Sequence, residues 1–313
     1  MVKRIIITVF SLLLLVYLVF FGDFFNLNLN DKQLETLIYL FKVYIGFSLV
    51  AFVVSEVFQN YSQVDKLWST IPIYYVWYFT AESGYDPRMV LMSVIATIWG
   101  LRLSYNFGRR GGYSIYFWVG EEDYRWKELK RIAPFLRPRL NWAVFNLFFI
   151  CLYQMGLVFL TTLPILAAWQ GANQISIYDY LIALLMLFFI IIETLSDQQQ
   201  YNFQTEKYKK IGLGEKLSGD YKRGFISTGL WSISRHPNFT SEQLIWIVFY
   251  LFSISATGNV FNWSIIGCIL LIVLFYNSAQ FSEGISSAKY PDYKIYQKNV
   301  PMFLGLSNSN WKK

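Results

Sequence analysis

The sequence has few charged side chains for its length. Of 313 residues only 15% are Asp, Glu, Lys or Arg, whereas a soluble domain carries about a quarter. The hydrophobic share is 55%, the aromatic share is 20%, and the mean hydropathy is +0.36. A disordered chain, a coiled coil, a secreted disulfide-bonded domain and an ordinary soluble enzyme are therefore poor interpretations. The composition indicates an integral membrane protein.

Metal ligands and nucleotide-binding motifs are also scarce. The chain has one histidine, His236, and two cysteines, Cys151 and Cys268, which lie inside apolar runs. Zinc sites built on several His and Cys ligands are excluded, and buried cysteine usually behaves as a small hydrophobic residue. We expect neither a disulfide nor a bound metal. No P-loop or dinucleotide fingerprint occurs, so a nucleotide would have to be held by helix ends and loops.

Long apolar runs recur along the chain, and each of about 20 residues is long enough to cross a bilayer. They predict an all-α fold, a polytopic integral membrane bundle of seven or eight transmembrane helices. The count is open because the run 67–82 contains Pro72 and could be re-entrant or kinked. No cleavage pattern follows the first run, which we interpret as an anchor. The predicted spans cover 5–21, 36–54, 67–82, 89–106, 141–168, 179–196, 240–257 and 263–281.

Positive charge is concentrated in a few loops. The net charge is +7, from 27 Lys and Arg against 20 Asp and Glu. With seven or with eight spans, the positive-inside rule places loops 107–140 and 197–238 and the C-terminal tail on the cytoplasmic face. The basic residues therefore indicate membrane-adjacent loops and membrane lipids as neighbours, not nucleic acid. No repeat or linker divides the sequence, so we expect one integral membrane domain over 1–313.

Ionisable residues inside apolar runs are costly and indicate function by default. Arg102 lies near the cytoplasmic end of a predicted span, where it either snorkels to the headgroups or serves a site. Glu193 and Asp197 stand one helical turn apart, and Gln200 and Gln204 continue the same face. A structural ion pair and a cofactor contact are both compatible with this acidic stripe.

The stretch 229–242 is the densest in polar chemistry. Pro237 disfavours a helical conformation at His236, and Asn238 or Thr240 could cap the helix that follows. A capped helix start is one interpretation, and an anion-binding site at the same helix start is the other.

A second polar segment, at Arg109 and Arg110, offers two guanidinium groups on a Gly-rich loop. Such groups suit bidentate contacts to phosphate. Lipid headgroups are the alternative ligand.

Taken in order, these segments resemble the steroid 5-alpha-reductase-like superfamily. The best match is its uncharacterised membrane branch, within the 3-oxo-5-alpha-steroid 4-dehydrogenase C-terminal family, and it covers a core over residues 60–305. Each motif is weak alone, and the combination is specific. The motifs are Val64-Asp65-Lys66-Leu67-Trp68, Trp99-Gly100-Leu101-Arg102-Leu103, Arg109-Arg110-Gly111-Gly112, Glu121-Glu122-Asp123-Tyr124-Arg125-Trp126, Glu193 with Asp197-Gln198, Gly229-Leu230, Ser234-Arg235-His236-Pro237-Asn238 and Tyr290-Pro291-x-Tyr293-x-x-Tyr296.

The resemblance implies a membrane oxidoreductase that uses cytosolic NADPH. Its substrate would be a lipid-soluble, sterol-like or fatty molecule with a C=C bond conjugated to a carbonyl, and in a eukaryote its location would be the endoplasmic reticulum. By resemblance, Asn238 and Glu242 would hold the nicotinamide carboxamide, and Asp197 would contact the adenosine or diphosphate. The remaining implied cofactor residues are Arg109 and Arg223 at the phosphates, Arg235, His236 and Tyr290 in a cytoplasmic lid, and Arg102.

One departure concerns the proton donor. The steroid reductases polarise the substrate carbonyl with a tyrosine and a glutamate, and the tyrosine position is occupied here by Trp99. Glu56 and Asp65 are candidates for the acid, and Tyr105 is a candidate proton donor. Two other functions remain open. One is an S-adenosylmethionine-dependent methyltransferase of the isoprenylcysteine carboxyl type, which shares the Arg-His-Pro turn, and the other is a non-catalytic lipid-binding protein.

Overall fold

The computed structural model describes residues 28–308, and every regular element in this range is a helix. The predicted all-α membrane class is confirmed. Within the described range six segments are long and apolar enough to cross a bilayer, while the predicted span 5–21 lies outside it. Seven or eight spans in total stay a prediction. The six segments are Asp31–Phe58, Pro87–Gly108, Arg139–Gln170, Ile177–Gly212, Pro237–Thr257 and Trp263–Lys289.

The run 67–82 forms two short helices, α3 (Gln63–Trp68) and α4 (Ile71–Glu82). The 12 residues of α4 rise about 18 Å, which is less than the roughly 30 Å of the hydrocarbon core. Pro72 lies in the first turn of α4, where its missing N–H breaks no helical hydrogen bond. The proline therefore begins a helix and does not kink one.

The segment Arg139–Gln170 changes its helical geometry along its length. It contains α7 (Arg139–Phe145), the π-helical η3 (Asn146–Tyr153), α8 (Gln154–Thr162) and α9 (Pro164–Gln170). The wider π turns expose backbone carbonyls to other helices, and Leu152 O accepts a hydrogen bond from the Tyr44 hydroxyl at 3.0 Å. Such π segments are frequent at functional sites.

The chain divides into two compact units. The described part of unit 1 comprises 28–183 and Val248–Leu271, and that of unit 2 comprises Leu184–Ile247 and 272–308. The boundaries fall inside three helices: α10 (Ile177–Gly212), α12 (Pro237–Thr257) and α13 (Ile266–Lys289). A single domain over 1–313 stays a prediction.

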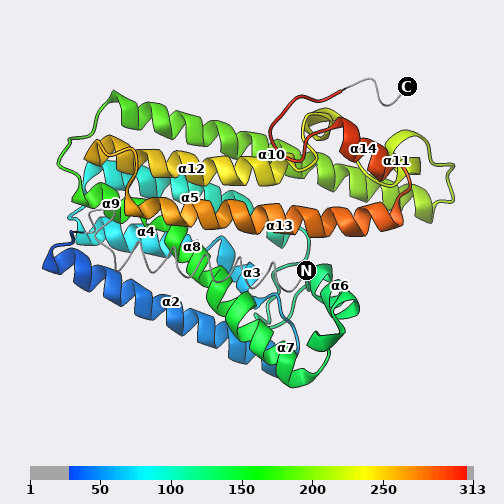
Figure 1. Cartoon of the computed structure of the whole chain (residues 1–313), viewed down its shortest axis with the longest axis horizontal. Helices are drawn as coiled ribbons and strands as arrows, with labels where there is room; N and C mark the ends of the chain where they lie inside the picture. Colours follow the sequence, from blue (N-terminus) through cyan, green and yellow to red (C-terminus); the bar gives the residue numbers. More distant parts are fainter. Residues whose placement is uncertain (1–27, 309–313) are drawn as a thin grey trace. The chain divides into compact units, whose positions relative to one another are not determined.

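Unit 1 is a helical bundle with an aromatic core. Helix α8 runs beside α2 (Asp31–Phe58) and α4 (Figure 1). Helix α4 also packs against α5 (Pro87–Gly108), whose Trp99 is fully buried. A Cβ on Gly100 would lie 2.5 Å from Ser69 O, so the absent side chain permits this close approach. The remaining short elements of the unit are α6 (Tyr124–Ile132), η2 (Pro134–Leu136) and η5 (Trp263–Ile265).

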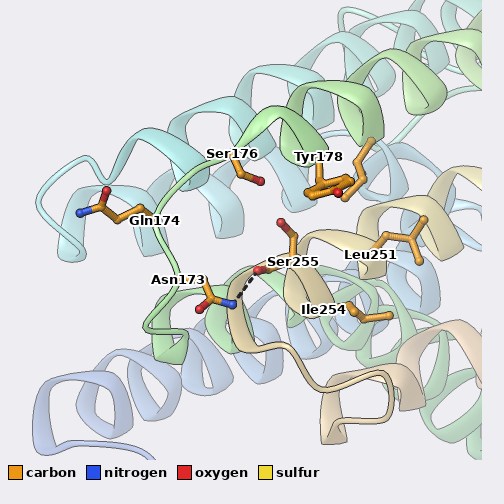
Figure 2. Close-up of a pocket in the computed structure, with 8 residues that line it drawn as sticks. Asn173, Gln174, Ser176, Tyr178, Leu251, Ile254 and Ser255 are labelled. Carbon is orange, nitrogen blue, oxygen red and sulfur yellow. Dashed lines mark hydrogen bonds between the residues drawn. The ribbon is translucent and has the colours of Figure 1, made fainter.

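A buried ion pair fixes the start of α10 in unit 1. Arg88 Nε donates to Asp179 Oδ1 at 2.8 Å, and the Arg88 guanidinium also donates to Asn173 O and Gln174 O. Asn173 and Gln174 also line a cavity of about 410 Å³, together with Ser255 and apolar side chains of α10 and α12 (Figure 2). The Arg88 contacts indicate a structural role for this pair.

Unit 2 combines the C-terminal parts of α10 and α13 and the N-terminal part of α12 with three short helices. These are α11 (Gly219–Arg223), η4 (Gly229–Ser232) and α14 (Tyr293–Asn299). Two buried clusters hold them in place. They consist of Phe225, Tyr293, Tyr296 and Val300, and of Phe203, Ile226 and Trp231.

Candidate cofactor site

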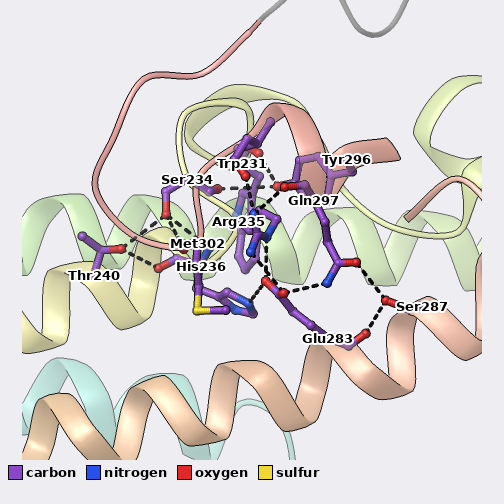
Figure 3. Close-up of polar contacts among 11 residues, drawn as sticks. Trp231, Ser234, Arg235, His236, Thr240, Glu283, Ser287, Tyr296, Gln297 and Met302 are labelled. Atoms are coloured by element: carbon purple, nitrogen blue, oxygen red, sulfur yellow. Dashed lines mark hydrogen bonds and ion pairs between the residues drawn. The ribbon is translucent and has the colours of Figure 1, made fainter. Parts of the chain in front are cut away.

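A buried charge cluster surrounds Glu283 in unit 2 (Figure 3). Arg235 donates to both carboxylate oxygens, from Nε at 2.6 Å and from Nη2 at 3.1 Å. His236 Nε2 lies 2.9 Å from Glu283 Oε1, and Gln297 Nε2 donates to Oε2 at 2.7 Å. Because an ionised carboxylate only accepts hydrogen bonds, His236 is the donor in its contact. One carboxylate thus orients both the arginine and the histidine of the Arg-His-Pro turn.

The C-terminal segment is tied to the same turn. The backbone amides of Arg235 and His236 donate to Pro301 O at 2.9 Å and Met302 O at 3.2 Å. The Tyr296 hydroxyl donates to Trp231 O, and burial raises the pKa of this phenol, so it stays a donor. The turn before α12 is therefore held from two sides. Helix α12 begins at Pro237, so neither Asn238 nor Thr240 is the N-cap.

Asn238 carries a hydrogen-bond acceptor that the described residues leave unused. Asn238 Nδ2 donates to Asp197 Oδ1 at 3.3 Å, and this contact fixes the amide orientation because a carboxylate cannot donate. Asn238 Oδ1 is buried, and no described residue hydrogen-bonds to it. A buried acceptor without a partner costs about 1–3 kcal/mol. The arrangement suits a ligand that donates a hydrogen bond.

Glu242 follows Asn238 by one turn on α12. It is 4% exposed, and its Oε1 accepts from Trp246 Nε1 at 3.1 Å. Glu193 and Asp197 are both buried on α10. The structure thus brings Asp197 to Asn238, and it places Glu242 on the same helix as Asn238.

Unit 2 also contains a cavity of about 600 Å³, and none of the predicted site residues is among the residues that line it. Its wall includes Phe203 and Tyr221, whose rings stack at a centroid distance of 5.3 Å. Arg223 Nη1 contacts Asp220 Oδ1 at 3.3 Å, in the helix that carries Tyr221. The polar residues of the cavity wall are Gln199, Tyr201, Asn202, Thr205, Glu206 and Thr228. A flat aromatic group with polar substituents would match this lining.

Tyr290 contributes to the packing of unit 2. Its ring lies 6.0 Å from that of Phe225. It also covers Gly224, whose φ of +90° and lack of space for a Cβ require glycine.

The predicted residues of unit 1 occupy different environments. Arg109 donates to Asn106 Oδ1 from Nε at 3.0 Å and from Nη2 at 2.7 Å. Tyr105 is 71% exposed, and the Arg109 guanidinium lies 5.7 Å from the centre of its ring. Arg102 is half-buried. Because Arg109 is partly buried and oriented by Asn106, its guanidinium is held in a defined position.

The two candidate acids of unit 1 have distinct partners. Glu56 Oε1 accepts from Asn146 Nδ2 at 2.8 Å, in the π-helical segment. Burial, with a smaller contribution from nearby Asp123, raises the pKa of Asp65 to about 6. Asp65 therefore exchanges its proton close to neutral pH, which is the property a general acid requires.

Sequence reasoning missed several buried polar residues. Glu283 is the one acidic residue of α13, and an ionisable group in an apolar helix is the signal that could have found it. Tyr75 is 0% exposed, and no described residue hydrogen-bonds to its hydroxyl. Nothing in the sequence around Tyr75 distinguishes it from its tyrosine neighbours.

Known proteins match most of the chain. Residues 51–300 match the DUF1295 family, described as a protein of unknown function, and this family is in the steroid 5-alpha-reductase-like group. An uncharacterised protein of Schizosaccharomyces pombe is 32% identical over 309 aligned residues, which span 91% of this chain and 85% of the relative. No solved structure matches.

Proposed function

The chain belongs to the DUF1295 family, and we propose that it is an NADPH-dependent membrane reductase of a C=C bond conjugated to a carbonyl. The substrate would be a lipid-soluble, sterol-like or fatty molecule. The observation that carries this proposal is the buried, unused acceptor of Asn238, whose amide is oriented by Asp197. NADPH would supply the hydride.

The Asn238 acceptor matches the nicotinamide carboxamide. The NH₂ group of that carboxamide donates hydrogen bonds, and Asn238 Oδ1 would accept one of them. Glu242, one turn further along α12, offers a second acceptor, a buried carboxylate, on the same helix. A ligand that donates to Asn238 Oδ1 would remove the cost of burying this oxygen unpaired. Under the proposal, the buried oxygen therefore gains a hydrogen-bond partner when the cofactor binds.

The remaining roles follow from the chemistry of each side chain. Arg109 and Arg223 would bind the phosphates, with Arg102 nearby in sequence, because guanidinium groups bind phosphate well. Arg235 and His236 contact Glu283, so they would act by holding the turn that presents Asn238. Tyr290 would cover the cytoplasmic side. We propose that the loops 107–140 and 197–238 face the cytosol.

The substrate carbonyl needs a proton donor. Asp65 suits this role best among the three candidates, because its pKa of about 6 leaves a protonated fraction near neutral pH. Glu56 is oriented by Asn146 and would serve as an electrostatic partner. Tyr105 is the third candidate.

Ligand-induced thermal stabilisation in detergent tests the proposal. A ligand that binds only the folded state adds about 2.7 kcal/mol of stability when its concentration is 100 times its Kd. We expect NADPH to raise the unfolding temperature of the wild type and to do so less for Asn238→Ala and Glu242→Ala. Asn277→Ala is the matched control, since this exposed asparagine of α13 hydrogen-bonds to Val273 O of its own helix. NADPH should still stabilise this variant fully.

Three results would overturn the proposal or parts of it. Stabilisation by S-adenosylmethionine alone would favour the methyltransferase. NADPH binding that Asn238→Ala leaves unchanged would show that the nicotinamide is misplaced. Equal stabilisation by NADH would reject contact between Arg109 or Arg223 and the additional phosphate.

A further inference from the structure

The loop between α5 and α6 exposes a continuous set of large apolar side chains. We define the aromatic loop as residues 115–119. Ile115 is 100% exposed, Tyr116 62%, Phe117 61% and Val119 48%. Unlike apolar residues scattered singly over a surface, a contiguous exposed set marks an interaction site.

The aromatic loop is held rigidly by hydrogen bonds to its backbone. Lys66 Nζ donates to Phe117 O at 2.7 Å and to Val119 O at 2.9 Å, and Gln63 Nε2 donates to Trp118 O at 3.2 Å. Lys66 and Gln63 are themselves buried. Because the carbonyl groups turn inward to these donors, the exposed side chains are presented as a preformed surface.

The surface continues onto a membrane-spanning helix. Trp118 stacks on Phe58 at a centroid distance of 5.1 Å, and Phe58 ends α2. The neighbouring residues Val57 and Val53 of α2 are 66% and 56% exposed. Since α2 is a candidate span, these valines belong to a lipid-facing stripe, and the aromatic loop extends that stripe beyond the end of the helix.

We propose that the aromatic loop inserts into the interfacial zone of the bilayer and contacts membrane lipids. The loop lies between the candidate spans Pro87–Gly108 and Arg139–Gln170, so it emerges at the membrane surface. Tyrosine and tryptophan favour this zone, where the apolar ring body meets lipid and the polar tip meets water. Arg109 and Arg110 precede the loop, and Glu121, Glu122 and Asp123 follow it after Gly120. Because these acids offset the two arginines, we attribute insertion to apolar contact and not to attraction to anionic lipids.

A fluorescent label at the tip of the loop tests this insertion. Ile115→Cys in the full chain would be labelled with an environment-sensitive nitrobenzoxadiazole dye and reconstituted in phosphatidylcholine vesicles. Cys151 and Cys268 are buried, so the dye should react at the new cysteine, and the wild type measures any background. We expect a blue-shifted emission that quencher-bearing lipids reduce and that aqueous iodide leaves unchanged.

Leu213→Cys is the matched control. Leu213 is 64% exposed and follows directly after α10, whose 36 residues rise about 54 Å. This length exceeds the roughly 40–45 Å of a bilayer with its headgroups, so a label there should sit in water. Its emission should be red-shifted and quenched by iodide.

Three outcomes would overturn the proposal. Equal iodide quenching at both positions would place the loop in water. A blue-shifted label that neither lipid quenchers nor iodide reach would indicate a protein-covered surface. Repetition in vesicles with phosphatidylglycerol should give the same lipid quenching. If lipid quenchers acted only in the anionic vesicles, the loop would be bound by electrostatic contact and not by apolar insertion.

Discussion

Removal of the Glu283 carboxylate should destabilise the protein strongly. Glu283 accepts hydrogen bonds from Arg235, His236 and Gln297, and its side chain is 5% exposed. Truncation in Glu283→Ala would leave an arginine charge buried without its counter-ion, which typically costs about 3–5 kcal/mol. Arg235 keeps two carbonyl acceptors, Gln297 O and Val300 O, so we expect the lower end of this range.

Thermal unfolding of the detergent-solubilised protein measures this loss. Glu283→Gln keeps an acceptor oxygen without the charge. Its unfolding temperature should lie between those of the wild type and of Glu283→Ala. Glu128→Ala is the control, since it removes an ion pair of similar geometry with Arg131 on the exposed surface. Such pairs contribute little to stability. If Glu283→Ala unfolded at the same temperature as the wild type, the inference that this buried cluster stabilises unit 2 would be refuted.

Five further substitutions have defined expected effects on stability, and thermal unfolding measures each. Tyr75→Phe removes a buried hydroxyl without a partner and should leave stability unchanged or raise it, whereas Tyr44→Phe removes a hydrogen bond to η3 worth about 0.5–1.5 kcal/mol. The folded state raises the pKa of Asp65 from 3.8 to about 6, so it binds the proton more tightly than the unfolded chain, and stability should fall as pH rises through this window. Asp65→Asn should abolish that fall and add up to about 3 kcal/mol at neutral pH, at about 1.4 kcal/mol per pKa unit; an unchanged pH profile would contradict this. Gly267→Ala would collide with a backbone carbonyl of α8 and should cost about 1–3 kcal/mol, while Gly46→Ala in α2, with open space around it, should not destabilise.

The membrane helices could be predicted because the apolar runs needed only length and hydropathy. The segments 36–54 and 179–196 fall inside α2 and α10. The structure of the run 67–82 could not be predicted in the same way. Its composition matches that of a membrane span, but the turn before Ile71 divides it into α3 and α4. Composition does not report where a helix ends. The π-helical turns of η3 could not be predicted from the sequence either, since they depend on contacts with other helices.

The candidate site could be predicted only where its chemistry is local. Asn238 and Asp197 are recognisable in the sequence as polar groups beside apolar runs, and the structure joins them at 3.3 Å. The role of Glu283 is not recognisable there, because its contacts to Arg235 and His236 bridge 48 and 47 positions of sequence. A single acid in an apolar helix looks the same whether it snorkels to the surface or binds a buried arginine. Only the tertiary fold distinguishes the two.

The turn before α12 shows how tertiary contacts change the meaning of a local motif. Unpaired amide groups at a helix start favour an anion, which was one interpretation of the Arg-His-Pro sequence. Here the amides of Arg235 and His236 already donate to Pro301 O and Met302 O. The side-chain atom that the described residues of this turn leave without a partner is the acceptor of Asn238. A ligand group that donates a hydrogen bond would meet the need of this acceptor, and this is how the proposed nicotinamide carboxamide would bind beside the turn.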